Sequence, residues 1–209
     1  MPHSRKGLAG RIAALKLSHP EVVEAFDAID RADFVPAGAR GRAYQDRPIE
    51  IPGGQTTSQP SLIAHMIDAA HPGPGDKVLE VGTGFGFQTA LLAHLSERVV
   101  SIDRMPELVE AARRNLERAG IAGATVQEGD GWQGVAEEAP FDAIIVSAAA
   151  TSVPDPLVDQ LAEGGRLVIP VKKGGSDDVL LYVKNDGKLV LERLISPARF
   201  VPLVQEMTT

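Results

Sequence analysis

The chain has 209 residues, of which 44% are hydrophobic and 23% are charged, and this composition fits one folded domain with a sizeable core. Cysteine is absent, which excludes disulfides, thiolate nucleophiles and cysteine-ligated zinc or iron–sulfur sites. The net charge of −7 argues against nucleic acid as a partner, because phosphate binding needs a basic face. No apolar run approaches the roughly 18 residues of a membrane span, and the first residues lack the apolar core of a secretory signal. We therefore expect a cytoplasmic protein.

The first quarter of the chain predicts helices followed by an irregular segment. Residues 6–35 carry apolar side chains at helical spacing, and His19-Pro20 divides them into two short amphipathic helices. Residues 36–59 are rich in proline and glycine. That composition is typical of a loop laid over a scaffold, where substrate contacts are often found.

A regular alternation of strands and helices begins near Ser58. Ser58 is a candidate helix N-cap, because Pro60 follows it in the first helical turn. Strand and helix patterns then alternate, which predicts an α/β fold with a mostly parallel sheet and helices on both faces. The expected strands are Lys77–Val81, Arg98–Ile102, Ala124–Gln127, Phe141–Ser147 and Arg166–Val171, and the expected helices are Gly86–Leu95, Pro106–Ala119 and Pro154–Ala162.

Two further strands are predicted near the C-terminus. Val179–Lys184 and Lys188–Ile195 flank an Asn-Asp-Gly turn typical of a β-hairpin, so at least one of them runs antiparallel to the rest. They complete a Rossmann-like sheet of seven strands with a short N-terminal helical appendage. We predict that residues 1–59 form helices and a substrate-side loop packed on a cofactor-binding domain of residues 60–209, as one structural unit.

The sharpest local pattern is a buried strand that leads into a glycine-rich turn and then into a helix. Gly82, Gly84 and Gly86 let the chain turn tightly and let a ligand approach bare backbone beside a helix N-terminus. Their G-x-G-x-G spacing departs from the G-x-G-x-x-G fingerprint that positions a dinucleotide pyrophosphate. By itself, the turn is also compatible with a tight connection that binds no ligand.

Three acidic residues stand at the ends of three predicted strands. Glu80 precedes the glycine turn, Asp103 follows the last glycine by 17 residues, and Asp130 lies between two glycines after the third strand. An acid near the position of Asp103 accepts hydrogen bonds from ribose hydroxyls, and the carboxyl ends of parallel strands meet in one crevice. Asp130 alone is equally consistent with an ordinary turn aspartate.

These carboxylates favour a cationic nucleoside over a dinucleotide. Glu80 would repel a diphosphate, whereas a carboxylate suits a ligand that carries ammonium and sulfonium charges. S-adenosyl-L-methionine has that charge pattern. We therefore predict this cofactor, with S-adenosyl-L-homocysteine as the product.

Several blocks in collinear order carry a family resemblance over nearly the whole chain. They are QTTSQP at residues 55–60, VLEVGTGFGFQTALL at 78–92, GDG at 129–131, FDAIIVSAAA at 141–150, GGRLVIP at 164–170 and RFVPL at 199–203. The glycine turn is common to many methyltransferases, whereas the first and last blocks are more specific. Together they resemble the protein-L-isoaspartate (D-aspartate) O-methyltransferase family, which implies a class I S-adenosylmethionine-dependent methyltransferase fold.

The resemblance implies an activity and its partners. The expected enzyme esterifies the α-carboxylate of L-isoaspartyl residues, with D-aspartyl residues as a further acceptor, in damaged proteins or peptides. The ester then closes to a succinimide without the enzyme, which allows partial return to normal aspartate. We expect a monomer with no nucleic acid, membrane or metal partner, and the histidines show no paired metal-ligand spacing.

The resemblance also implies site residues. It makes Ser58 the active-site residue, Asp103 the ribose acid, and Asp130 with Gly131 the adenine-side pair. The implied cofactor set is Thr57, Gln59, Pro60, Glu80, Gly82, Thr83, Gly84, Asp103, Arg104, Asp130 and Gly131.

The chemistry is consistent with few polar catalytic groups. A carboxylate is already ionised at neutral pH, so no general base is needed to make the nucleophile. A neutral hydroxyl such as that of Ser58 can orient the carboxylate without overstabilising its charge. The alternative is that Ser58 caps the helix after it, and one lone pair cannot fully serve both roles.

Some positions depart from the family pattern and leave other functions open. Thr57 stands where isoleucine is usual, and Phe85 and Phe87 replace a usual serine and tyrosine. The nearest alternative is a peptide-tailoring methyltransferase that acts on an aspartate carboxylate of one partner peptide. A nucleotide-binding oxidoreductase or a non-catalytic module is the alternative from another class, and the glycine spacing and the block around Ser58 count against it.

Overall fold

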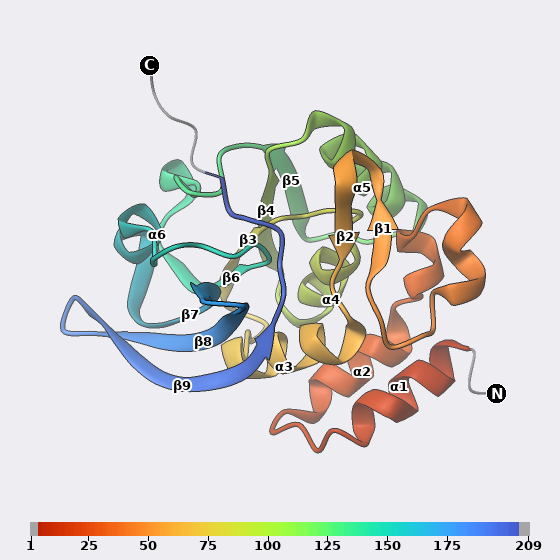
Figure 1. Ribbon diagram of the computed structural model, residues 1–209, viewed down its shortest axis with the longest axis horizontal. Coiled ribbons are helices and arrows are strands. Elements are labelled where there is room, and N and C mark those ends of the chain that lie inside the picture. Colours follow the sequence, from red (N-terminus) through yellow and green to blue (C-terminus); the bar gives the residue numbers. More distant parts are fainter. Residues whose placement is uncertain (1–3, 205–209) are drawn as a thin grey trace.

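The computed structural model describes residues 4–204, which begin with two short helices (Figure 1). Helix α1 (Arg5–Ala13) packs on α2 (Pro20–Ala28). Pro20 occupies the first turn of α2, where its missing N–H would have no partner in any case. The predicted break at His19-Pro20 is therefore confirmed. A short 3-10 helix, Arg31–Phe34, follows α2.

The segment of residues 36–59 contains regular structure, so the prediction of an irregular loop is wrong. A 3-10 helix (Ala37–Arg42) leads to strands β1 (Ile49–Ile51) and β2 (Gln55–Thr57), which pair antiparallel. Gly53 turns the chain between these strands with a φ of 72°. Strands of three residues are too short to leave a period-2 pattern in the sequence.

Helix α3 (Pro60–Ala70) has a different cap from the one predicted. Its N-cap is Gln59, whose side chain makes no capping hydrogen bond. Instead, Oδ1 of Asp46 accepts a hydrogen bond from the backbone N–H of Ser61 at 2.9 Å. The predicted N-cap role of Ser58 is therefore wrong, because a carboxylate from the preceding loop already binds the helix end.

A mixed sheet forms the centre of the molecule (Figure 1). Its strands are β3 (Lys77–Val81), β4 (Arg98–Asp103), β5 (Ala124–Glu128), β6 (Phe141–Val146), β7 (Leu161–Lys173), β8 (Ser176–Asn185) and β9 (Lys188–Ala198). In the described residues, these seven strands lie in the order β5-β4-β3-β6-β7-β8-β9. Neighbours from β5 to β7 are parallel, and β8 and β9 are added antiparallel. The predicted α/β fold is confirmed.

Helices cover both faces of this sheet. The larger apolar cluster joins one face to α1, α2, α3, α4 (Phe87–Leu95) and α5 (Pro106–Arg118). The other face packs against α6 (Asp155–Gln160). Adjacent residues of a strand point to opposite faces, so Val78 of β3 joins the first cluster and Leu79 the second. Within residues 4–204, no helix is long and apolar enough to cross a bilayer.

The C-terminal strands are longer than predicted. Helix α6 ends at Gln160 and β7 begins at the next residue, so the expected helix to Ala162 is too long. The predicted hairpin between β8 and β9 is confirmed. Asp186 and Gly187 form its turn with φ values of 51° and 70°, as an Asn-Asp-Gly sequence favours.

Candidate active site

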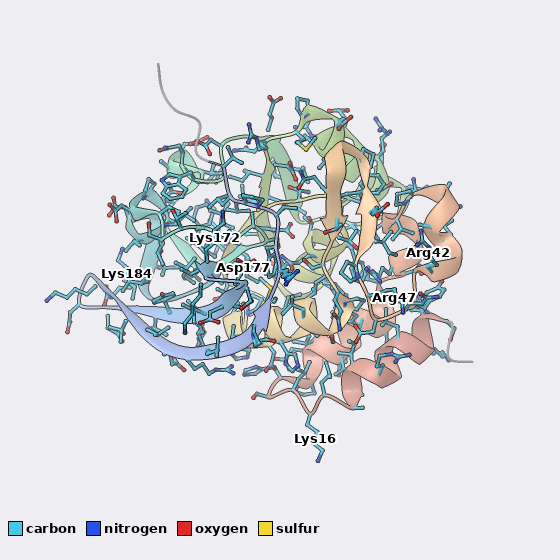
Figure 2. The ribbon with its side chains drawn as sticks, viewed as in Figure 1. Lys16, Arg42, Arg47, Lys172, Asp177 and Lys184 are labelled. Carbon is cyan, nitrogen blue, oxygen red and sulfur yellow. The ribbon has the colours of Figure 1, made fainter. Side chains whose placement is uncertain are left out.

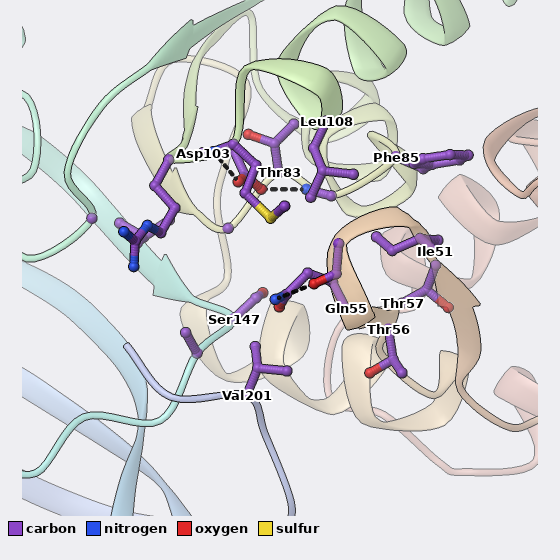
Figure 3. Close-up of a pocket in the computed structure, with 18 of the residues that line it drawn as sticks. Ile51, Gln55, Thr56, Thr57, Thr83, Phe85, Asp103, Leu108, Ser147 and Val201 are labelled. Atoms are coloured by element: carbon purple, nitrogen blue, oxygen red, sulfur yellow. Dashed lines mark hydrogen bonds between the residues drawn. The ribbon is translucent and has the colours of Figure 1, made fainter. Parts of the chain in front are cut away.

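A cavity of about 850 Å³ lies at the carboxyl end of the parallel strands. The turn after β3 and the end of β4 form one side of it, and the β1–β2 hairpin lies across from them. Figure 3 shows Thr56 of the hairpin opposite Thr83 and Asp103, with Ser147 and Val201 along a third side. The cavity therefore lies where open α/β sheets commonly bind ligands.

The cavity brings together most of the predicted site residues. Its walls contain Thr57, Ser58, Gly82, Thr83, Gly84, Asp103, Arg104 and Gly131. Four predicted residues do not line it, namely Gln59, Pro60, Glu80 and Asp130.

The glycine turn gives the cavity a wall of backbone. Gly82 and Gly84 have φ values of +96° and +55°, which glycine adopts without strain. A Cβ on Gly82 would lie 3.3 Å from the Cβ of Ser147. The N–H groups of Gly82 and Thr83 donate to the carbonyl of Ile102 at 2.8 and 3.3 Å. These donors are already bound, so the turn suits a flat ligand surface better than a pyrophosphate.

Asp103 is one of the ionisable groups in the cavity wall, together with Arg104 and Glu107. Its Oδ2 accepts a hydrogen bond from the N–H of Gly84 at 2.9 Å, and its Oδ1 accepts one from the N–H of Met105 at 3.0 Å. Burial raises the pKa of Asp103, and these backbone hydrogen bonds act in the opposite direction. A backbone hydrogen bond from Arg104 acts on the pKa in the same direction. A carboxylate has about four acceptor positions, so the group can still accept from a ligand hydroxyl.

Glu80 does not meet Asp103 in the cavity, contrary to the prediction. Its side chain is fully buried between the sheet and α4, where Oε2 accepts from the hydroxyl of Ser101 at 2.6 Å and from that of Thr89. Burial raises the pKa of Glu80 to about 7. The two-residue period of a strand explains the difference, because Val81 lines the cavity and Glu80 therefore points to the other face.

In the Gly-Asp-Gly segment after β5, likewise, one predicted residue lines the cavity and the other does not. Gly131 lines the cavity, and a Cβ at this position would lie 2.5 Å from Cγ1 of Val81. Asp130 does not line it, and its Oδ1 accepts from the backbone N–H of Trp132 at 2.9 Å. The carboxylate of Asp130 thus has the turn role that was its alternative interpretation.

A second cavity, of about 450 Å³, adjoins the first. The residues that line both are Thr56, Thr57, Ser58, Ser147 and Val201. Ser58 therefore lies at the junction. Within the described range, 4–204, its hydroxyl makes no hydrogen bond, whereas its carbonyl accepts from Arg31 at 3.2 Å. A hydroxyl with free donor and acceptor capacity thus lies between two spaces large enough for ligands.

Gln59 and Pro60 follow Ser58 in the chain and stabilise the loop at this junction. The side-chain amide of Gln59 donates to Oδ2 of Asp46 at 3.1 Å and to the hydroxyl of Ser61 at 2.9 Å, and Gln59 lines only the second cavity. Pro60 is buried in the first turn of α3. Both residues hold the loop that carries Ser58 and do not reach the larger cavity.

Gln88 and Ser147 also line the cavity, although they are not among the predicted site residues. The amide nitrogen of Gln88 donates to the hydroxyl of Ser147 at 3.1 Å, and no partner among the described residues binds its buried carbonyl oxygen. This acceptor fits an amino group of S-adenosylmethionine, and Asp103 fits its ribose hydroxyls. Ser147 directly follows β6, so the strand-end rule could have found it, whereas Gln88 carries no comparable signal.

The two phenylalanines that depart from the family pattern have different surroundings. Phe85 is half-buried in the wall of the larger cavity, next to the glycine turn. Phe87 also lines this cavity, but it is buried and packs edge-on against Phe26, with ring centroids 5.7 Å apart. Phe87 therefore ties α4 to the N-terminal helices.

Comparisons with known proteins agree with this geometry. The sequence matches the family Protein-L-isoaspartate(D-aspartate) O-methyltransferase (PCMT) over residues 9–208. A protein-L-isoaspartate O-methyltransferase of Methanoculleus marisnigri is 45% identical over 194 residues, which cover 93% of this chain and 88% of that protein.

Two solved structures share the fold. A protein-L-isoaspartate O-methyltransferase is 30% identical with a TM-score of 0.85, and the match covers 96% of this chain and 66% of that longer chain. A Plasmodium falciparum structure assigned to the same class contains S-adenosyl-L-homocysteine. It is 25% identical with a TM-score of 0.85, and the match covers 96% of this chain and 98% of that one. These likenesses confirm the predicted class I methyltransferase fold.

Proposed function

The chain belongs to the protein-L-isoaspartate(D-aspartate) O-methyltransferase family, and on this premise we propose that its two cavities hold the donor and the acceptor of one methyl transfer. Its activity is S-adenosylmethionine-dependent methylation of isoaspartyl residues, the first step in their repair. The larger cavity takes the cofactor and the smaller one takes the isoaspartyl segment. The Ser58 hydroxyl at their junction, which no other described residue hydrogen-bonds, is the observation that carries this assignment.

The larger cavity suits the cofactor in shape and in charge. When bound, S-adenosylmethionine supplies an electrophilic methyl group on a sulfonium centre. Asp103 would accept from the ribose hydroxyls, and the backbone of Gly82 and Gly84 would pack against the ligand. Gln88 would accept from an amino group through its carbonyl oxygen, which has no hydrogen-bond partner within residues 4–204. These assignments replace the predicted direct contact of Glu80.

Ser58 is assigned an orienting role. The α-carboxylate of an isoaspartyl residue has a pKa of about 3 to 4, so it is a nucleophile at neutral pH without a general base. The Ser58 hydroxyl would donate to one of its oxygens and leave the other directed toward the larger cavity. The catalytic contribution is then positioning and exclusion of water, with no covalent intermediate on Ser58.

Three matched peptides test the acceptor. They carry isoaspartate, aspartate or asparagine at one position, and they are incubated with S-adenosylmethionine labelled in the methyl group. Base-labile methanol from the isoaspartyl peptide alone is the expected result. Label chiefly in the aspartyl peptide would favour the tailoring reaction, and label in none of the three would overturn the proposal.

We expect the two parts of the chain to act as one structural unit. Residues 1–59 would form helices and a substrate-side segment packed on the cofactor-binding domain of residues 60–209, as one unit. The β1–β2 hairpin of the first part contributes residues to both cavities. A monomer in the cytoplasm, with D-aspartyl residues as a further acceptor, stays a prediction from the sequence. Sedimentation, cell fractionation and a D-aspartyl peptide test these points separately.

A further inference from the structure

Arg31 is a buried cation on the acceptor side of the molecule. Its residue exposure is 0%, and its two terminal nitrogens make five hydrogen bonds. The acceptors are the backbone carbonyls of Ala43 at 3.0 Å, Gln45 at 3.0 Å, Arg47 at 3.2 Å and Ser58 at 3.2 Å, and the hydroxyl of Thr57 at 2.9 Å. One side chain thus binds five acceptors, while its Nε has no hydrogen-bond partner among the described residues.

These bonds join two separate stretches of chain. The first, residues 43–47, contains Asp46, which lines the second cavity and caps α3. The second, residues 57–58, contains Ser58. Both stretches line the second cavity, so Arg31 anchors two of its walls to one rigid group.

The other side of Arg31 contacts the cofactor half of the molecule. Its guanidinium carbon lies 5.7 Å from the centre of the Phe87 ring, at a distance typical of a cation–π contact. Burial lowers the pKa of Arg31 to about 10, and the charge of Asp46 opposes that shift, so the side chain stays charged at neutral pH. The charge therefore persists under the conditions of the reaction.

We propose that Arg31 is a positioning residue for the acceptor: it fixes the backbone around Ser58 against the Asp46 wall, so that the hydroxyl meets the isoaspartyl carboxylate. This inference rests on the proposed function. Arg31 has no atom in the walls of either cavity, so it acts through Ser58 and does not contact the substrate itself. Thr57, at the position where the family usually has isoleucine, adds a side-chain acceptor to this arrangement.

Arg31→Lys tests the inference, because lysine keeps the charge but cannot reach two stretches with a planar fork. We expect kcat/KM for an isoaspartyl peptide to fall by about tenfold or more, while the Kd for S-adenosyl-L-homocysteine by calorimetry changes by less than about threefold. Hydrogen exchange should rise at amides of residues 43–58 and stay unchanged in β3 and β4.

A matched control is available on the same segment. Arg42 is an exposed arginine of the 3-10 helix before β1, and Figure 2 shows Arg42 and Arg47 on this outer part of the molecule. Arg42→Lys makes the same chemical change without touching the Arg31 hydrogen bonds. It should leave kcat/KM, the Kd and the exchange pattern at their wild-type values.

A double variant separates positioning from general stability. If Arg31 acts through Ser58, then Arg31→Lys should lower kcat/KM by less than about twofold in a Ser58→Ala background. The inference would be overturned if Arg31→Lys lowered kcat/KM by the same factor in the Ser58→Ala background as in wild type. It would also be overturned if Arg31→Lys lowered cofactor affinity as much as kcat/KM. If wild type methylates no isoaspartyl peptide, the proposed function fails, whereas an active wild type with an equally active Arg31→Lys contradicts only this inference.

Thr57→Val provides the test if Arg31→Lys does not fold. It keeps the shape of the side chain and removes the hydroxyl oxygen, which accepts from Arg31 and also from the backbone N–H of Ile49 at 3.2 Å. We expect a smaller fall in kcat/KM, of about threefold, with unchanged affinity for S-adenosyl-L-homocysteine. A Thr57→Val enzyme with wild-type kcat/KM would then contradict the inference.

Discussion

Asp46 accepts a hydrogen bond from the backbone N–H of Ser61 at 2.9 Å, and through this bond the loop before β1 caps helix α3. The second carboxylate oxygen of Asp46 holds the amide of Gln59 at 3.1 Å. The sequence allows Ser58 either to cap the helix or to orient the substrate carboxylate, and in the structure the capping role belongs to Asp46. Asp46 binds the helix end, and the Ser58 hydroxyl stays available at the junction of the two cavities.

Replacement of Asp46 tests the capping role. Asp46→Ala should lower the free energy of unfolding by about 1 kcal/mol, because the first turn of α3 loses its acceptor, and Asp46→Asn should cost less. Urea unfolding followed by circular dichroism measures both variants. Calorimetry should show unchanged affinity for S-adenosyl-L-homocysteine. Equal stability of wild type and Asp46→Ala would contradict the cap.

Replacement of Ser58 tests the orienting role. Ser58→Ala should lower turnover of an isoaspartyl peptide by about 10- to 100-fold, because the carboxylate loses a hydrogen bond that directs its attack. The affinity for S-adenosyl-L-homocysteine should stay within about twofold. Steady-state kinetics and calorimetry measure the two quantities, and the exposed Ser152→Ala variant is the control. A parallel loss of turnover and cofactor affinity would instead place Ser58 in the donor site.

Asp103 is expected to dominate cofactor affinity. Asp103→Asn should weaken binding of S-adenosyl-L-homocysteine by about 10- to 100-fold, because the amide gives up charge-assisted hydrogen bonds. The control is Glu128→Gln. Glu128 is an exposed carboxylate at the end of β5, and it lies opposite Asp103 in the register of β4 and β5. Calorimetry at fixed pH measures both. Equal affinities of Asp103→Asn and wild type would exclude Asp103 from the cofactor site.

Glu80 should make stability depend on pH. Its pKa is about 7 in the folded state against an ordinary value of 4.5, so the folded protein holds this proton more tightly. The resulting stabilisation is fully present below about pH 4.5 and is lost as the pH rises through 7. Relative to Glu80→Gln, wild type should lose up to about 3 kcal/mol of unfolding free energy between pH 5 and pH 8.

Urea unfolding at pH 5, 6, 7 and 8 measures this difference. Glutamine keeps an oxygen that can accept from Ser101 and Thr89, so the comparison isolates the charge. A difference between the two proteins that is constant over this range would show that Glu80 does not titrate there.

Residue patterns over short stretches of the sequence determined most of the fold. Buried strands such as Lys77–Val81 and the helix start at Pro106 depend on residue patterns within a few positions, and both appear as predicted. The Asn-Asp-Gly turn likewise acts through its own backbone preferences. Asp103 could also be placed, because the carboxyl ends of parallel strands converge for any sequence with this alternation.

Only the tertiary structure decided which distant side chains contact one another or line the same cavity. The alternation of strand faces buried Glu80 away from Asp103, and the folding of the loop against α3 brought Asp46 to a helix end 15 residues further along the chain. Arg31 likewise meets acceptors 12 to 27 residues away. Sequence patterns encode periodicity and turn preference, which are local, whereas hydrogen bonds between distant segments depend on how the packed core orients them.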